Sequence, residues 1–238
     1  MKKLVMLVLS SLLAASMAWA GATPGTGVVG SKHDLRALAG GTDERVCAFC
    51  HTPHHADVTS FSYMPLWSHE VTAETFVEYF SQTFDGWDNL VDPVTGPSVL
   101  CMSCHDGAVA PDAYYGQAGS VTPEGDAYGE YGIGLGGDMT NDHPIGFNYE
   151  DAMLDTNNAT PEIRDADADL GVVADIAAQV GHIGTIRNLL FDDDFDGTNE
   201  TFTCASCHDV HNGPSVKEDY FLYADQNDSA FCRMCHIK

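Results

Sequence analysis

The hydrophobic pattern along this chain is regular in only a few short stretches. Short helices are expected at 71–80, 98–105 and 169–180, and in the last of these Val172, Val173, Ile176 and Val180 recur near helical spacing. Gly-rich stretches such as 116–137 follow neither the helical nor the strand period. The expected fold class is therefore mostly coil with short α-helices and minimal β structure.

The first 20 residues have the pattern of a secretory signal peptide. Lys2 and Lys3 precede the apolar stretch 4–17, and Ala18-Trp19-Ala20 forms a small-x-small cleavage site. The apolar stretch is short for a membrane-spanning helix, and no second apolar segment follows it. We therefore expect residues 1–20 to be removed and residues 21–238 to form a single exported domain without membrane insertion.

The charge balance excludes some classes of partner. The chain has 35 acidic and 10 basic side chains and a formal net charge of −25. A nucleic-acid-binding protein needs a basic face, and anionic lipid attracts basic segments. Neither partner is expected here.

The cysteines carry the strongest chemical signal. All 8 fall into four pairs with two residues between, and a histidine follows every pair. C-x-x-C-H is the attachment signature of c-type haem, in which two thiols form thioethers and the histidine binds the iron. The pattern predicts four covalently bound haem c groups. The cysteines are Cys47, Cys50, Cys101, Cys104, Cys204, Cys207, Cys232 and Cys235, and the iron-binding histidines are His51, His105, His208 and His236.

Other uses of paired cysteines fit this pattern less well. Export favours disulfides, and C-x-x-C pairs also occur in zinc sites and redox dithiols. Neither zinc sites nor redox dithiols account for a histidine after every pair or for the absence of an unpaired cysteine.

Four haems change what the polypeptide must do. Each porphyrin is a large apolar plate, so the haems themselves are expected to form most of the core while the chain wraps them. The eight aromatic residues between Phe61 and Trp87 are then expected to pack on haem faces. One long haem-free insert, 106–203, separates the second motif from the third.

The sixth ligand of each iron distinguishes a carrier from an enzyme. Seven histidines remain for four positions. His54 and His211 each lie three residues after a motif histidine, on the same side of a helical turn, and so cannot reach the far face of their own haem. We expect each to ligate a neighbouring haem, which predicts close pairs between haems 1 and 2 and between haems 3 and 4.

The other histidines differ in context. His143, in Asp-His-Pro-Ile-Gly, sits in a constrained turn and is expected to be a ligand; His33 is a further candidate. His182 is a weaker candidate. His55 and His69 are not expected to bind iron.

Several fragments, in order along the chain from His33 to His236, resemble one known family. They are Gly-Ser-Lys-His-Asp-Leu (30–35), Cys-Ala-Phe-Cys-His-Thr-Pro-His (47–54), Pro-Leu-Trp (65–67), Cys-Met-Ser-Cys-His-Asp-Gly (101–107), His-Pro-Ile-Gly (143–146) and Cys-Ala-Ser-Cys-His-Asp-Val-His-Asn (204–212). They resemble the outer-surface multihaem cytochromes of metal-reducing bacteria, above all the tetrahaem, OmcE-like members that polymerise into extracellular filaments.

The resemblance implies bis-histidine iron, a coil-rich wrapping of stacked haems and a head-to-tail homopolymer. It implies that His33 ligates a haem of the adjacent subunit and that His54, His143 and His211 are the other distal ligands. Its partners would be upstream electron donors in the periplasm or outer membrane and extracellular electron acceptors. The location implied is extracellular or on the cell surface, with the periplasm as the alternative.

Three functions remain in view at this point. The first is a conductive filament that passes electrons along closely spaced haems, the second a soluble tetrahaem shuttle, and the third a multihaem reductase. An enzyme needs an open iron position, whereas spare histidines are plentiful here, so no catalytic residue is expected.

An acidic loop offers one further candidate. Asp192, Asp194 and Asp196, followed by Gly197, match the first half of a calcium-binding loop, but the twelfth position is Thr203 rather than Glu. A looser calcium site and a solvated acidic loop are the two interpretations.

Overall fold

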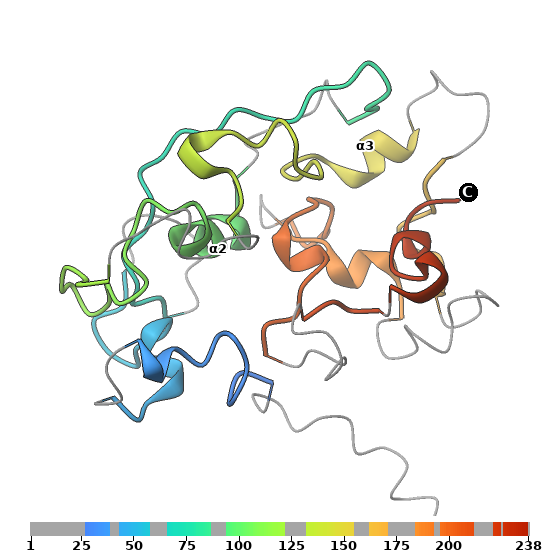
Figure 1. The fold of residues 1–238 in the computed structure, drawn as a ribbon. Helices are drawn as coiled ribbons and strands as arrows, with labels where there is room; N and C mark the ends of the chain where they lie inside the picture. The colour runs from blue at the N-terminus through green and yellow to red at the C-terminus, as the bar shows by residue number, and fades with distance from the viewer. Residues whose placement is uncertain are drawn as a thin grey trace, which may run out of the picture.

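The computed structural model consists of short helical turns joined by extended coil (Figure 1). It describes residues 27–38, 43–57, 66–86, 94–121, 132–154, 162–170, 184–192, 196–211, 221–224 and 226–237. The helical elements are η1 (Leu35–Ala37), η2 (Val46–Phe49), α2 (Pro97–His105), η6 (Leu135–Gly137), α3 (Tyr149–Leu154), η8 (Ile186–Leu189), η9 (Cys204–Ser206), η10 (Asn227–Ser229) and η11 (Cys232–Met234).

The coil-rich expectation is confirmed for these residues. The described residues form isolated β-bridges, and no strand is present in the described ranges. The helix expected at 98–105 is confirmed by α2. Only the first two residues of the helix expected at 169–180 fall within the described chain. The signal peptide lies outside the described residues, so both the helix and the signal peptide remain predictions.

The helix expected at 71–80 is wrong. This segment is extended, and Val77 forms a parallel bridge to Asp138 through hydrogen bonds with Gly137 and Met139. β-branched residues such as Val71 and Val77 favour extended backbone. Tertiary pairing with residues 137–139 therefore overrides the weak local preference for helix.

Helix α2 begins and ends at residues suited to those positions. Pro97 occupies its first turn, where its missing N–H costs no hydrogen bond. Gly96 precedes it with φ +51°, and a Cβ on Gly96 would lie 2.5 Å from the Phe191 ring. Gly107, with φ +73°, follows the helix end. The start of α2 is thus fixed against a residue far away in sequence.

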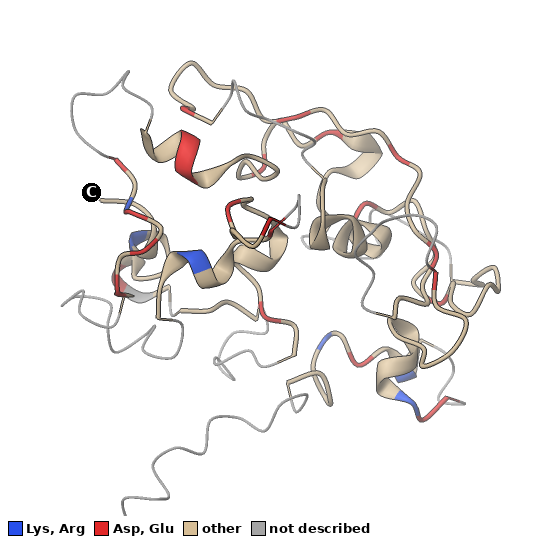
Figure 2. Ribbon diagram, turned by 180° about the vertical axis from the view of Figure 1, so that it is seen from behind, with Lys and Arg blue, Asp and Glu red and all other residues tan. Residues whose placement is uncertain are grey.

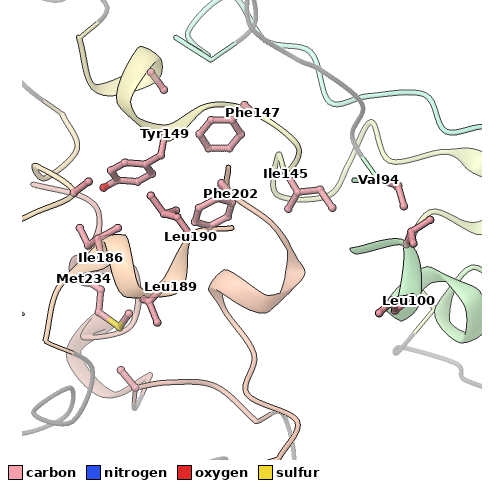
Figure 3. Packing of buried hydrophobic residues seen from close by; sticks show 14 of the residues in the cluster. Val94, Leu100, Ile145, Phe147, Tyr149, Ile186, Leu189, Leu190, Phe202 and Met234 are labelled. Carbon is pink, nitrogen blue, oxygen red and sulfur yellow. The ribbon is translucent and has the colours of Figure 1, made fainter. Parts of the chain in front are cut away.

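The apolar core lies mainly between α3, η8 and the two C-terminal motifs. The rings of Phe147 and Phe202 stack with centroids 5.3 Å apart, and Tyr149 lies parallel to Phe202 (Figure 3). Ile186 and Met234 complete this cluster. Four motif cysteines pack against it, namely Cys50, Cys204, Cys207 and Cys235.

No helix within the described ranges is long and apolar enough to cross a membrane. The motif-bearing segments follow one another through the molecule in chain order, from the pale-blue segment around η2, through α2 and η9, to the red segment at the C-terminus (Figure 1).

Candidate haem-binding sites

The four C-x-x-C-H motifs, called sites 1 to 4 in chain order, adopt helical turns. At sites 1, 3 and 4 the backbone N–H of the motif histidine donates to the carbonyl of the first cysteine, over 2.8, 3.1 and 3.0 Å. Site 2 forms the last turns of α2. Residues three and four apart on such a turn lie on one side, so both sulfur atoms and the imidazole of a motif can face one ligand.

Sites 1, 3 and 4 share a second feature, an antiparallel bridging segment. In each, the residue after the motif histidine donates its N–H to the bridging segment, and the bridging segment donates an N–H to the second cysteine's carbonyl. At site 1 Thr52 donates to Leu66 and Ser68 to Cys50. At site 3 Asp209 donates to Phe221 and Tyr223 to Cys207. At site 4 Ile237 donates to Glu162 and Arg164 to Cys235. The three sites are therefore copies of one local structure.

Neighbouring sites lie close together in chain order. The Cys50 thiol interacts electrostatically with Cys104, linking sites 1 and 2. The Cys101 and Cys204 sulfur atoms interact with each other, linking sites 2 and 3. The N–H of Cys204 also donates to Ser98 Oγ on α2 over 3.1 Å. The sites thus form a row.

Sites 3 and 4 are joined in the same way, through the second cysteine of each motif, whereas Cys232 is exposed. Cys207 interacts with Cys235, and burial raises the pKa of Cys207 to about 12 and that of Cys235 to about 11. Burial likewise raises the pKa of Cys50 to about 11. Zinc binding and dithiol redox chemistry use the thiolate, which burial disfavours at these three cysteines, whereas a hydrogen bond with Cys101 lowers the pKa of Cys204.

Three histidine rings outside the motifs lie opposite motif histidines. His211 lies opposite His51, with ring centroids 6.0 Å apart. His33 lies opposite His105 at 5.9 Å, and His143 lies opposite His236 at 6.4 Å. Each pair contains one motif histidine and one histidine that the sequence suggests as a distal ligand.

These separations match the geometry of one metal between two imidazoles. With a metal–nitrogen bond of about 2.0 Å and about 1.1 Å from ring centre to nitrogen, opposite ligands have centroids about 6 Å apart. The angle between the ring planes is free in such an arrangement. The described residues hold no group of three or more His, Cys, Asp or Glu side chains suited to a metal. A haem iron takes only two side chains, because the porphyrin supplies the other ligands.

The protonation of two distal candidates also suits iron. His143 Nδ1 lies 3.0 Å from the carbonyl oxygen of Pro144. An Nδ1–H that donates to this oxygen leaves the lone pair on Nε2, as in metal-binding histidines generally. At His33, burial first and the nearby His105, His208 and His211 next lower the pKa to about 4. Its imidazole is therefore neutral at physiological pH.

Several buried polar atoms that have no hydrogen-bond partner in the described chain lie at the same sites. They include His33 Nδ1, Trp67 Nε1 and Arg164 Nε. His33 lies at site 2, the Trp67 ring lies 5.9 Å from that of His51 at site 1, and Arg164 lies at site 4. Buried polar groups are normally hydrogen-bonded, so these atoms fit a bound group with acceptors, such as haem with its two propionates. Thiols, imidazoles and orphaned donors together fit haem c.

The remaining histidines have different surroundings. His54 is exposed. His55 is exposed with φ +61°. His69 is buried, with both ring nitrogens near carbonyl oxygens, of Glu70 at 2.8 Å and Ala110 at 3.1 Å. His182 lies outside the described residues. His54 and His182 remain the candidates for the sixth ligand at His208.

The ring pairs differ from the ligand pairing expected from the sequence, and which histidine binds which iron stays a prediction. His211 was expected to serve site 4 but faces His51 of site 1. His33 was expected to reach an adjacent subunit but faces His105 of its own chain, and its ring also stacks on Phe221 at 4.9 Å. Spacing along the chain indicates which histidines are available, whereas the bridging segments decide which site each one reaches.

The acidic loop has a local structure of its own. The Asp192 carboxylate accepts hydrogen bonds from the backbone N–H groups of Asp196 and Gly197, over 3.2 and 2.9 Å. Asp194 lies outside the described residues. A calcium ion here stays a prediction.

Sequence reasoning missed the bridging segments and two charged residues beside the motifs, Asp106 and Arg164. Asp106 follows His105 and is only 2 % exposed. A charged residue after an amphipathic turn is expected at the surface, so the sequence does not indicate this burial. Arg164 comes from the long insert, and only the tertiary bridge brings it to site 4.

Comparison with known proteins adds no relative. A scan against protein-family models finds no match, and a search of curated proteins finds no similar sequence.

Proposed function

We propose that this protein is a tetrahaem c-type cytochrome that transfers electrons along a row of closely spaced, bis-histidine haems. The observation that carries the proposal is the set of three ring pairs, at 5.9 to 6.4 Å, each joining a motif histidine to a histidine from elsewhere. Aromatic rings often lie at such distances. Three separate pairs of this composition, each at a C-x-x-C-H motif, favour iron ligation over ordinary packing.

Carrier chemistry is favoured over reductase chemistry at these sites. Two imidazoles on one iron leave no open position for a substrate, and a reductase needs one. Sites 1, 2 and 4 each have a candidate sixth ligand within the chain. We therefore propose no enzymatic activity and no catalytic residue.

We further propose that the exported protein assembles head to tail into an extracellular conductive filament, with a soluble shuttle as the alternative. The order of the sites supports this, because a row beginning near the N-terminal segment and ending at His236 can continue into the next subunit. Exposed apolar residues lie near both chain ends, Val29 and Leu38 at one and Ile237 at the other. Such contacts between unlike surfaces propagate when they do not close.

Sizing chromatography with negative-stain microscopy of the secreted protein tests the assembly. Filaments that carry four haems per chain support the full proposal. A monomer with four low-spin haems at high salt supports the shuttle. A high-spin haem that binds carbon monoxide in intact protein supports the reductase.

A further inference from the structure

Because sites 1, 3 and 4 share one local structure, the charges at equivalent positions of these sites can be compared. The bridging residue whose N–H donates to the second cysteine is Ser68 at site 1, Tyr223 at site 3 and Arg164 at site 4. The same backbone position thus carries a neutral side chain at two sites and a guanidinium at the fourth.

Arg164 is held in place without a carboxylate partner among the described residues. Its backbone N–H donates to Cys235 over 2.7 Å, and its Nη2 donates to the carbonyl of Arg233, within the motif, over 3.2 Å. Its Nε is buried and has no hydrogen-bond partner in the described chain. The nearby Asp165 is exposed, where water screens its charge. Within the described residues no carboxylate therefore neutralises the guanidinium at site 4, and its buried Nε is available to the bound group.

Three other arginines in the described chain behave differently. Arg36 pairs with Asp34, Arg45 with Asp43 and Arg187 with Asp167, over 2.7, 2.7 and 2.6 Å (Figure 2 shows how few basic residues there are). Neutralisation by a carboxylate is thus common in this acidic chain, and Arg164 departs from it.

Site 2 carries a buried charge of the opposite sign. Asp106 directly follows His105 and is 2 % exposed. Its carboxylate accepts hydrogen bonds from the Thr72 hydroxyl and, over 2.8 Å, from the Ala108 N–H. Both groups donate to the carboxylate, which holds it in place next to His105. The equivalent Asp209 at site 3 is less buried.

We infer that these two charges, the buried Asp106 and the half-buried Arg164, grade the midpoint potentials along the row, so that site 4 has the highest potential and site 2 the lowest. The inference rests on the proposed function. Reduction removes one positive charge from a haem, so a nearby cation favours the ferrous form and a nearby anion favours the ferric form. Burial weakens the screening of the Asp106 charge, and the buried Nε keeps part of the Arg164 guanidinium away from water. Electrons added one at a time by dithionite then occupy site 4 first.

The test is a spectropotentiometric titration of the purified holoprotein and four variants. Arg164→Gln is expected to lower the highest of the four midpoints and leave the other three in place, whereas Arg164→Lys, which keeps the charge, leaves all four near wild type. Asp106→Asn is expected to raise the lowest midpoint. Asn keeps the shape, and its amide can still accept from Ala108 and donate to the Thr72 oxygen.

Asp151→Asn, which removes an exposed carboxylate from α3, is the matched control and is expected to shift no midpoint. The pyridine haemochrome assay and circular dichroism establish that each variant keeps its haems and its fold. If Arg164→Gln and Asp106→Asn keep four haems but move no midpoint, or move a component other than the highest and the lowest, the graded-potential inference is wrong. Wild-type protein without covalent haem overturns the proposed function instead.

Discussion

At the scale of single residues, the chemistry depends on histidines brought together from distant parts of the chain. His143 and His236 are 93 positions apart, yet their rings lie 6.4 Å apart, and Pro144 orients the first through its carbonyl oxygen. The bridge between Ile163 and His236 holds the motif side of this pair. His143 is thus the clearest distal candidate on which to test iron ligation.

Replacing His143 by alanine is expected to leave four covalent haems and to convert one of the four to a high-spin form. The haem at site 4 loses its sixth ligand, while the thioethers and His236 are unaffected. About one quarter of the haem should then bind carbon monoxide, measured by optical difference spectroscopy. His55→Ala, which changes an exposed histidine, is the control and should stay low-spin throughout. A fully low-spin His143→Ala protein contradicts the assigned pair.

At the scale of the elements, α2 carries site 2 and connects it to site 3. Its buried face includes Ser98, whose hydroxyl accepts a hydrogen bond from the N–H of Cys204. Its start is fixed by Gly96, which has a positive φ and closely approaches the Phe191 ring. A defect at this position should therefore disturb two sites at once.

Gly96→Ala is expected to destabilise the protein by about 2 to 4 kcal/mol, because a positive φ costs about 1 kcal/mol and the Cβ meets the Phe191 ring. Thermal unfolding followed by circular dichroism measures the change. Gly116→Ala is the matched control. Gly116 also has a positive φ, +70°, but a Cβ added there would meet nothing within 4 Å. Equal losses for the two variants would show that the contact with Phe191 contributes nothing.

The sequence predicts local structure well where chemistry repeats and poorly where distant segments meet. The motif turns and the helix at 98–105 follow from spacing, from Pro97 and from Gly96. The extended segment 71–80 and the bridge that delivers Arg164 to site 4 depend on partners far away in the chain. No local period encodes such contacts, which is why the sequence identifies His143 and His236 as candidate ligands but does not indicate that their rings lie together.

At the scale of the whole molecule, the acidic surface governs association. Red acidic segments are spread over the ribbon, and blue basic ones are few (Figure 2). With a formal net charge of −25, like subunits repel one another. Any head-to-tail contact must overcome this repulsion.

Filament formation is therefore expected to increase as salt rises from about 10 mM to about 0.5 M, because the screening length falls from about 30 Å to a few ångströms. Light scattering during a salt titration measures it. Assembly that weakens steadily over this range would indicate that ion pairs, rather than apolar contacts, hold the subunits together.

The position of His33 makes a further prediction at this scale. Because His33 faces His105 of its own chain, an isolated wild-type monomer should have a low-spin haem at site 2. His33→Ala should make that haem high-spin even in the monomer. If His33 instead completes a neighbour's haem, the wild-type monomer has one high-spin haem that becomes low-spin only on assembly. Electron paramagnetic resonance of size-selected monomers distinguishes the two arrangements.

Intact-protein mass spectrometry of the exported protein, after extraction with acidified acetone, tests the central claim most directly. Thioether-bound haem survives this treatment, so the account predicts the mass of residues 21–238 plus four haems, with one haem on each peptide that contains Cys47, Cys101, Cys204 or Cys232. A haem-free mass would contradict the account, and so would a mass lowered by two hydrogens for each disulfide formed between these cysteines.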